Sequence, residues 1–548
     1  FMTSSLNLHI AQVNPTVGDL KGNADIVRSI RDNAADETNL IIFPEMVLTG
    51  YPLEDLVLKP SFLTETRNHL EELVKESKGN AAAMLVTLPI EENGKIYNAF
   101  SVVKNGEILA TRYKHELPNY GVFDEARVFC PGELPDPIEM NGVKLGIMIC
   151  EDMWYPEVTK NFCDKGAEIL IIPNGSPYDC RKMDARFRLA RQRTAECGLP
   201  LVYVNPYGGQ DELVFDGGSF ILSHDKQAVY QAPYFEEHQV LTKWEKEDGN
   251  WICNTQNEIS YPDESSAMYR ASVLGLKDYL HKNGHSDVLI GLSGGIDSAL
   301  SAAIAVDALG PDHVHCVMMP SPFTSQESLD AGKACADSLG VDYQIIPIID
   351  AMKGFEEMLP EISGVAHENM QSRLRGLILM SLSNMHGHLV LSTGNKSENA
   401  VGYATLYGDM CGAYSVLKDM FKNQVYLLSH WRNENMPRGG LGPDGKVIPE
   451  IILSRPPSAE LRHDQKDEDS LPPYDELDRI LRLLVEEDMS FEDIIADGHH
   501  PNTVLDIWNK VDSTEYKRRQ GPPGVKLTTR SFGRERRYPM TNKYRPRL

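Results

Sequence analysis

Short apolar runs alternate with amphipathic segments through residues 5–230. Apolar positions at helical spacing predict helices over residues 20–36 and 183–198, and Gly198 marks the end of the second. Residues 99–114 predict a β-hairpin that turns at Asn105-Gly106. Strand-like runs occupy residues 6–14, 39–45, 81–90, 144–150, 168–176, 199–209 and 218–223. This alternation is typical of a layered α/β fold.

A second α/β pattern begins near residue 267 and reads as strand, helix, strand, helix. Such alternation predicts a parallel, doubly wound sheet. Its expected helices are residues 265–284, 297–310 and 328–340, and its expected strands are 287–292, 314–320 and 343–348.

The two patterns are separated by a polar, irregular stretch over residues 239–266. We therefore expect two domains, 5–245 and 267–548, joined by a linker over 246–266. The charged, Pro- and Gly-rich segment 438–473 predicts a mobile loop.

The composition argues against several classes of protein. The chain has 54 Lys and Arg against 79 Asp and Glu, a formal net charge of −25, which disfavours a general nucleic-acid binder. No apolar run approaches the ~20 residues of a membrane span, and the first residues lack the pattern of a signal peptide. Nine cysteines without a CxxC pair indicate reduced thiols, so we expect a cytoplasmic protein.

The stretch after Tyr516 is strongly basic, with Phe532 and Tyr538 between its arginines. One interpretation is nucleic-acid binding. Since the whole chain is acidic, we expect instead that this stretch docks on an acidic surface of the chain or of a neighbouring subunit.

A glycine-rich turn, "GLSGGIDSAL", joins a predicted buried strand to a predicted helix. Its glycines allow a tight turn and close approach of a ligand. The free N–H groups and positive end of the helix that follows form a cradle for phosphates. Asp297 would repel phosphates unless it holds Mg²⁺. The alternative is a glycine turn with an acidic first helical residue. The predicted ATP-binding residues here are Gly291, Leu292, Ser293, Gly294, Gly295, Ile296, Asp297 and Ser298.

This turn resembles the loop of the ATP-pyrophosphatase family, which splits ATP to AMP and pyrophosphate while adenylating a substrate. Residues 367–384 and 390–422 are similar to the NAD synthetase branch, which amidates deamido-NAD. That resemblance implies ATP contact by Thr393, metal and substrate contact by Glu398, and Mg²⁺ as the metal shared with Asp297. It also implies deamido-NAD contacts by Asn369, Arg373 and Lys517. For Arg373 and Lys517 alone, a solvated surface charge is the ordinary alternative.

Three strand-like runs of the first half end in reactive side chains, namely Glu45, Lys114 and Cys150. Glu151 and Asp152 follow Cys150, and such neighbours disfavour the thiolate that a cysteine nucleophile requires. If the strands end at one sheet edge, Lys114 can offset these acids and favour thiolate, while Glu45 moves protons. Taken singly, each residue is as well explained by packing or by the surface.

The ordered trio, with "FPE", "YKHELPNYGVFDE" and "ICEDMW" around it, resembles the nitrilase superfamily of carbon–nitrogen hydrolases. That resemblance implies an αββα sandwich and glutamine as substrate, held by Tyr120, Ser176 and Lys182. The two resemblances together cover residues 5–540.

Together they imply an enzyme that amidates deamido-NAD with ATP, through an acyl-adenylate, using ammonia from glutamine. They also imply a homo-oligomer whose partners are small-molecule substrates, without nucleic acid or membrane. One alternative keeps both sites but changes the acceptor that is amidated. Another makes the first half an inactive hydrolase fold that serves only as a scaffold.

Overall fold

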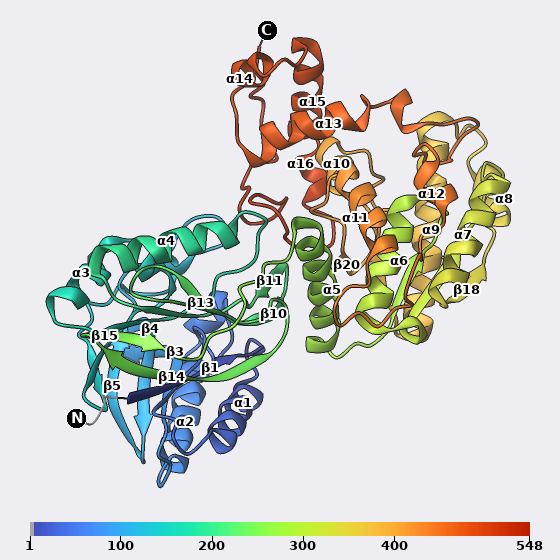
Figure 1. The fold of residues 1–548 in the computed structure, drawn as a ribbon. Helices are drawn as coiled ribbons and strands as arrows, with labels where there is room; N and C mark the ends of the chain where they lie inside the picture. Colours follow the sequence, from blue (N-terminus) through green and yellow to red (C-terminus); the bar gives the residue numbers. More distant parts are fainter. Residues whose placement is uncertain (1–4, 548) are drawn as a thin grey trace. The chain divides into compact units, whose positions relative to one another are not determined.

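The computed structural model describes residues 5–547 of the chain, so the last residue of the predicted second domain, Leu548, lies outside the described residues. The chain divides into two compact units (Figure 1). The first comprises residues 1–210 and 214–262, of which 1–4 are outside the description. The second comprises residues 211–213 and 263–548. Each unit is described by itself below.

The first unit is built on two β-sheets, and a short hairpin accompanies them. The larger sheet has seven strands in the order β15-β14-β1-β2-β3-β4-β5, and the smaller has six in the order β13-β12-β9-β8-β7-β6. The strands of the larger sheet are β1 (Ser5–Gln12), β2 (Leu40–Ile42), β3 (Ala83–Glu92), β4 (Lys95–Lys104), β5 (Glu107–Tyr113), β14 (His238–Glu247) and β15 (Asn250–Cys253). Those of the smaller sheet and the hairpin are β6 (Ile138–Met140), β7 (Val143–Ile147), β8 (Ile169–Pro173), β9 (Leu201–Val204), β10 (Tyr207–Gln210), β11 (Leu213–Asp216), β12 (Phe220–Leu222) and β13 (Ala228–Gln231).

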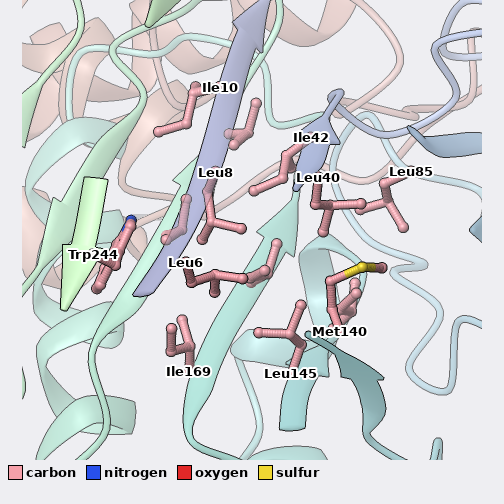
Figure 2. Packing of buried hydrophobic residues seen from close by; sticks show 14 of the residues in the cluster. Leu6, Leu8, Ile10, Leu40, Ile42, Leu85, Met140, Leu145, Ile169 and Trp244 are labelled. Atoms are coloured by element: carbon pink, nitrogen blue, oxygen red, sulfur yellow. The ribbon is translucent and has the colours of Figure 1, made fainter. Parts of the chain in front are cut away.

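Apolar side chains from the two sheets face each other and form a buried core, seen closely in Figure 2. Leu8 and Ile10 of β1 and Ile42 of β2 belong to this core together with Leu145 and Ile169 of the other sheet. Helices cover the outer faces: α1 (Leu20–Asn33) and α2 (Pro60–Glu76) pack on the larger sheet, and α3 (Pro156–Asp164) and α4 (Lys182–Cys197) on the smaller. The predicted αββα sandwich is therefore confirmed.

Local signals account for most of these boundaries. The Asp19 side chain accepts a hydrogen bond from Gly22 N–H and starts α1, and Gly198 ends α4 in the left-handed conformation, as predicted. Asn105 and Gly106 both have positive φ, and they connect β4 and β5 in the predicted hairpin.

Part of the predicted linker is instead a sheet edge. The interval 246–266 includes the end of β14 and all of β15, which pair with each other antiparallel beyond β1. Trp244 and Trp251 are buried in the core, while Glu245 and Glu247 are exposed. Buried and exposed positions therefore alternate as they do in strands at the edge of a sheet with one solvated face. The charged residues on that face obscured this alternation in the sequence.

The second unit contains a five-stranded, entirely parallel sheet in the order β18-β17-β16-β19-β20. Its strands are β16 (Val288–Gly291), β17 (Val314–Met318), β18 (Asp342–Ile345), β19 (Leu389–Ser392) and β20 (Tyr414–Ser415). The order of strands reverses at β16, so the loops after β16 and β19 mark the switch point where such sheets bind ligands. The predicted doubly wound sheet is confirmed.

Helices surround this sheet, and α6 (Ile296–Leu309) is the most deeply buried of them, with every residue except Asp297 buried. The others near the sheet are α5 (Glu264–Lys282), α7 (Gln326–Leu339), α8 (Ile349–Met358), α9 (Gly364–His386), α10 (Lys396–Val401), α11 (Lys422–Glu434) and α12 (Glu450–Ser454). A separate apolar cluster joins α10 to α13 (Tyr474–Leu481), α14 (Phe491–Ala496) and α15 (Pro501–Ser513), and α16 (Glu515–Arg518) follows.

Two further expectations concern the end of the chain. The segment 438–473 is held by specific contacts: it contains α12, and Glu460 accepts hydrogen bonds from Ser325 (2.8 Å) and Ser328 (2.8 Å) at the start of α7. The basic stretch docks on its own unit in part, since Arg518 (2.7 Å) and Arg536 (2.9 Å) both pair with Glu515. No helix among residues 5–547 has the length and apolar character that a bilayer span requires.

We predict that Leu8→Ala destabilises the first unit by about 2–5 kcal/mol, because Leu8 is 0% exposed between the two sheets and its loss leaves a cavity. Leu109→Ala on β5 is the matched control, since Leu109 is 49% exposed and its loss costs within ~0.5 kcal/mol. Calorimetric melting of both variants checks this. Equal melting temperatures for the two variants would contradict the packing described.

Candidate functional site

A buried lysine lies at the centre of the candidate site in the first unit. Lys114 follows β5 and is 1% exposed. Its Nζ lies 2.8 Å from Glu45 Oε1 and 3.0 Å from Glu125 Oε1. Burial alone would lower the pKa of Lys114, but the two carboxylates outweigh it and hold the pKa well above its usual value. Lys114 is therefore a fixed ammonium ion in a place that excludes water.

Glu45 presents one oxygen to this lysine and leaves the other unpaired. Glu45 Oε1 accepts hydrogen bonds from Lys114 and from Asn98 Nδ2, the latter at 2.7 Å. Oε2 is buried and has no hydrogen-bond partner among the described residues. A Cβ added to Gly175 would lie 2.8 Å from this oxygen, so the small residue there keeps space beside it. The unpaired oxygen is suited to accept a proton.

Cys150 lies in a strained turn directly after the β7 segment. It begins the short 3₁₀ helix Cys150–Met153 with φ of +44°, in the left-handed region that non-glycine residues seldom adopt. The Gly175 backbone N–H donates a hydrogen bond to its sulfur, and both Glu45 and Lys114 interact with it electrostatically. The three predicted catalytic residues thus lie together.

The charge balance at Cys150 differs from the sequence expectation. Burial, and then the carboxylate of Glu45, raise the pKa of Cys150 well above its usual value, although Lys114 lowers it. Lys114 therefore favours thiolate as expected, but burial and the Glu45 carboxylate outweigh its effect in the free site. The thiol keeps its proton, and a base has to remove it when a substrate is attacked.

Glu125 is a fourth member of this cluster that the sequence reasoning did not select. It accepts hydrogen bonds from Lys114 and from Tyr51 Oη at 2.9 Å. Burial raises its pKa to about 7, against the opposing effect of Lys114. Its position closes the quoted "YKHELPNYGVFDE" run, eleven residues after Lys114, and this second acid was the available signal.

The two acids after Cys150 have separate partners. Asp152 accepts backbone hydrogen bonds from Glu116 (2.7 Å), His115 (3.1 Å) and Ile149 (3.1 Å), so it ties the Cys150 turn to the segment after Lys114. Glu151 accepts a hydrogen bond from Tyr120 Oη at 2.9 Å. Glu151 still raises the pKa of Cys150, and both acids also orient the groups around this thiol.

The predicted glutamine-binding residues lie around Cys150, and each is held there by different contacts. Lys182 begins α4, and its Nζ lies 4.6 Å from the centroid of the Trp154 ring. Burial, and then Arg186, lower its pKa, while the charge of Cys150 acts on it in the opposite sense. The Ser176 carbonyl accepts a hydrogen bond at 2.7 Å from Arg186, which is itself paired with buried Asp216. Tyr120 is 45% exposed, so it is accessible to a ligand.

The glycine loop of the second unit borders a cavity of about 300 Å³. The predicted ATP-binding residues line this cavity, and Thr393 is among them. Gly294 is the exception. Gly294 has φ of +82°, and a Cβ there would lie 2.4 Å from the Ser328 carbonyl oxygen. Only glycine therefore allows the loop to pass against α7.

The two predicted metal ligands face one lysine at this cavity. Asp297 Oδ2 lies 2.5 Å from Lys422 Nζ, and Glu398 Oε1 lies 3.7 Å from the same nitrogen. Asn395 Nδ2 also donates to Asp297 Oδ1 at 3.0 Å. Burial, and then the charge of Asp297, raise the pKa of Glu398 well above its usual value. Two convergent carboxylates fit a hard divalent cation, whose charge would relieve this repulsion.

Lys422 is a site residue whose role the sequence left insecure, because Phe421 precedes it where the resembled family often has proline. The structure places Phe421 at the start of α11 and Lys422 directly against the two carboxylates. Arg375, Lys418, Arg455 and Arg518 also line the cavity and were not selected. Together these five cations suit a polyphosphate ligand.

The three predicted deamido-NAD contacts meet at a loop that borders the same cavity through Tyr403 and Ala404. Lys517 Nζ donates to the carbonyls of Gly402 and Ala404, each at 2.9 Å. Arg373 Nε donates to the Leu406 carbonyl (3.1 Å), and Asn369 accepts from Thr405 Oγ1 (3.0 Å). All three therefore contact the loop 402–406, and none of them lines the cavity, whereas Glu398 does.

Comparison with known families agrees with this division of the site. Residues 8–243 match the carbon-nitrogen hydrolase family, and residues 268–521 match the NAD synthase family.

Full-length relatives share both parts. A glutamine-dependent NAD(+) synthetase of Rhodobacter capsulatus is 45% identical, covering 99% of this chain and 100% of the relative. Another, from Aquifex aeolicus, is 42% identical, covering 98% of this chain and 100% of the relative. The solved structure of the enzyme from Acinetobacter baumannii in complex with ADP is 38% identical with a TM-score of 0.78, covering 98% of this chain and 99% of that one. A Cytophaga hutchinsonii structure, 21% identical with a TM-score of 0.80 over 98% of each chain, shares the fold.

We predict that Glu45→Gln increases alkylation of Cys150 by iodoacetamide several-fold at neutral pH. The substitution removes a negative charge that raises the pKa of the thiol, so more thiolate forms. Glu133→Gln, at an exposed carboxylate, is the control. Peptide mass spectrometry of the Cys150 peptide measures the rate. A slower reaction in Glu45→Gln would mean that Glu45 activates the resting thiol rather than suppressing it.

Proposed function

Since the chain belongs to the family of glutamine-dependent NAD(+) synthetases, we infer that it amidates deamido-NAD to NAD with ATP, taking the nitrogen from glutamine. The enzyme is a ligase that forms a carbon–nitrogen bond and releases AMP, pyrophosphate and glutamate. The observation that carries the glutamine half is the buried cluster in which Lys114 contacts Glu45 and Glu125 beside Cys150.

Cys150 is the proposed nucleophile of the glutamine half. Its sulfur attacks the side-chain amide carbon of glutamine while Oε2 of Glu45 accepts the thiol proton. Lys114 stabilises the oxyanion that forms, because its ammonium is held in a buried position without reorganisation. Glu45 returns the proton to the departing ammonia, and water then hydrolyses the thioester to glutamate.

Glutamine itself is a zwitterion, so its recognition requires charges of both signs. Lys182 offers a cation for the α-carboxylate, and the Tyr120–Glu151 pair offers an anion for the α-ammonium. Ser176, fixed by Arg186, borders the same region through Gly175. These three predicted residues are therefore proposed as the glutamine contacts.

The ATP half is proposed to bind its nucleotide on the loop from Gly291 to Ser298, with Thr393 beside it. The Acinetobacter baumannii relative was solved in complex with ADP, which supports nucleotide binding by this chain. Because the cavity gathers Arg375, Lys418 and Lys422 around the glycine loop, the polyphosphate charge is met from several sides.

Asp297 and Glu398 are the residues that would hold Mg²⁺. When bound, the ion offsets the negative charge of the phosphates and polarises the α-phosphate for attack by the nicotinate carboxylate. Lys422, which contacts both carboxylates, keeps them paired and oriented toward the cavity. Asn395 holds the second oxygen of Asp297 in place.

Asn369, Arg373 and Lys517 are proposed to shape the deamido-NAD site through the loop 402–406, which they hold from three directions. Glu398 lines the ATP cavity together with Tyr403 and Ala404 of that loop, and it is proposed to contact both substrates. The family assignment disfavours a different acceptor, the alternative left open by the sequence.

We predict that Cys150→Ala loses glutamine-driven NAD synthesis by more than about 10³-fold but retains synthesis driven by ammonium, because the two sites do separate chemistry. Cys130→Ala, which removes another thiol of the same unit, is the control. NAD is measured with deamido-NAD and ATP present throughout. Loss of both activities in Cys150→Ala alone would leave Cys150 as a structural residue and the first unit as a scaffold.

We also propose that the chain is a cytoplasmic homo-oligomer. All nine cysteines are free, as expected in a reducing compartment. Helices α8 and α9 expose Met358 (72%), Leu377 (61%) and Met385 (71%), and exposed apolar side chains of this kind favour contact with a second copy.

We predict that Leu377→Glu lowers the oligomeric mass observed by light scattering, because a carboxylate in an apolar interface is costly to bury. Leu427→Glu on α11 is the matched control, since Leu427 is 54% exposed. Unchanged masses for both variants would place any interface elsewhere on the chain.

A further inference from the structure

A group of histidine and aspartate side chains lies at the amino edge of the parallel sheet of the second unit. Asp287, His315 and His388 form its centre, and each offers a ligand atom within 4.8 Å of the other two. We call these three residues the amino-edge triad. His313, Asp342 and His386 lie around it.

The topology of the sheet brings the triad together. Asp287 immediately precedes the central strand β16, His315 is the second residue of β17, and His388 immediately precedes β19. Strands β17 and β19 both pair with β16 in parallel, so their first residues meet at one edge. Three strands that are distant in sequence therefore each contribute one side chain.

Ion pairs and ring stacking already link these groups. His315 Nε2 lies 3.0 Å from Asp287 Oδ1, and His315 Nδ1 lies 3.2 Å from Asp342 Oδ2. The rings of His315 and His388 stack with their centroids 4.0 Å apart and their planes at 12°. His313 Nδ1 lies 3.4 Å from the second oxygen of Asp287.

The triad is neither sealed nor fully solvated. The side chains of His315 and Asp287 are 20% and 24% exposed, so an ion can enter from solvent and still find ligands in fixed positions. Preorganised ligands of this kind lose little freedom when they bind a metal.

The glycine loop lies at the opposite edge of the same sheet, after the carboxyl end of β16. Leu292 lies five residue steps along the strand from Asp287, about 16 Å at ~3.3 Å per residue. The proposed ATP chemistry therefore makes no use of the triad.

We propose that the amino-edge triad binds a divalent transition-metal ion of the zinc and cobalt class, ligated by one carboxylate oxygen and two imidazole nitrogens. This donor set suits zinc, cobalt, nickel or copper, whereas magnesium and calcium prefer sites made of oxygen alone. The ion replaces the proton between His315 Nε2 and Asp287 Oδ1, and that proton leaves to the buffer. One nitrogen of each histidine ring already lies within 4.8 Å of the carboxylate oxygen and of the other nitrogen.

The consequence is a cross-link between three strands. Because the ion binds only where β16, β17 and β19 are assembled, it stabilises the folded second unit according to its free concentration. At a concentration 100 times the dissociation constant this amounts to a 100-fold shift in the folding equilibrium.

Cobalt(II) binding to the full-length protein, with any polyhistidine tag removed, tests the proposal. We expect one equivalent per chain by equilibrium dialysis, with visible d–d absorption and without the near-ultraviolet charge-transfer band of thiolate ligands. His388→Gln and Asp287→Asn should each lose this equivalent. His430→Gln, at an exposed histidine of α11, should keep it.

His388→Gln is the informative variant, because the His388 ring stacks on the rings of His315 and His386, and its loss leaves the contact between His315 and Asp287 in place. Its melting temperature without metal should equal that of the wild type, whereas the cobalt-induced increase in melting temperature should disappear. Ammonium-driven NAD synthesis should be unchanged.

Three results would overturn the proposal. The first is absence of a stoichiometric cobalt site in the wild type. The second is equal cobalt binding by wild type, His388→Gln and Asp287→Asn. The third is a charge-transfer band showing that a cysteine thiolate holds the ion.

Discussion

The first unit depends on one constraint, which is that a lysine ammonium and two carboxylates share a volume from which water is excluded. Lys114 is held there by Glu45 and Glu125, at 2.8 and 3.0 Å. Removing either partner would leave uncompensated buried charge, which typically costs about 3–5 kcal/mol. The shared burial is also what sets the chemistry: Glu125 has a pKa of about 7, Lys114 stays charged, and Cys150 keeps its proton until a base takes it.

Both units place their chemistry where strands end. In the first, Glu45 follows β2, Lys114 follows β5 and Cys150 follows β7. In the second, the carboxyl ends of β16 and β19 lead into the glycine loop and Thr393, and the amino ends of β16, β17 and β19 gather the amino-edge triad. Strands β2, β7, β16 and β19 are largely apolar and buried, so the reactive side chains beside them lie in the residues that flank the strands.

The sequence predicted a layered α/β fold and a doubly wound sheet from periodicity, which is a local property, and it implied the αββα sandwich and the trio through motifs that resemble the nitrilase superfamily. It did not reveal Glu125, whose role arises from a distance of 3.0 Å to Lys114 and not from its neighbours in the chain. The sequence left the role of Lys422 insecure, since its partners Asp297 and Glu398 come from α6 and α10. The end of β14 and all of β15 were taken for a linker, because charged outward residues hid the alternation that buries Trp251. The direction in which the pKa of Cys150 shifts depends first on the burial of the thiol, and composition does not show burial.

Trapping the covalent intermediate tests the central claim most directly. The enzyme, supplied with glutamine, ATP and deamido-NAD, is quenched in acid during turnover, and its peptides are analysed by mass spectrometry. A glutamyl thioester on the Cys150 peptide, absent from Lys114→Met, is the expected result, because the ammonium is needed to stabilise the oxyanion that precedes it. Glutamate release with no adduct on Cys150, or with an equal adduct in Lys114→Met, would contradict the role of the buried charge cluster.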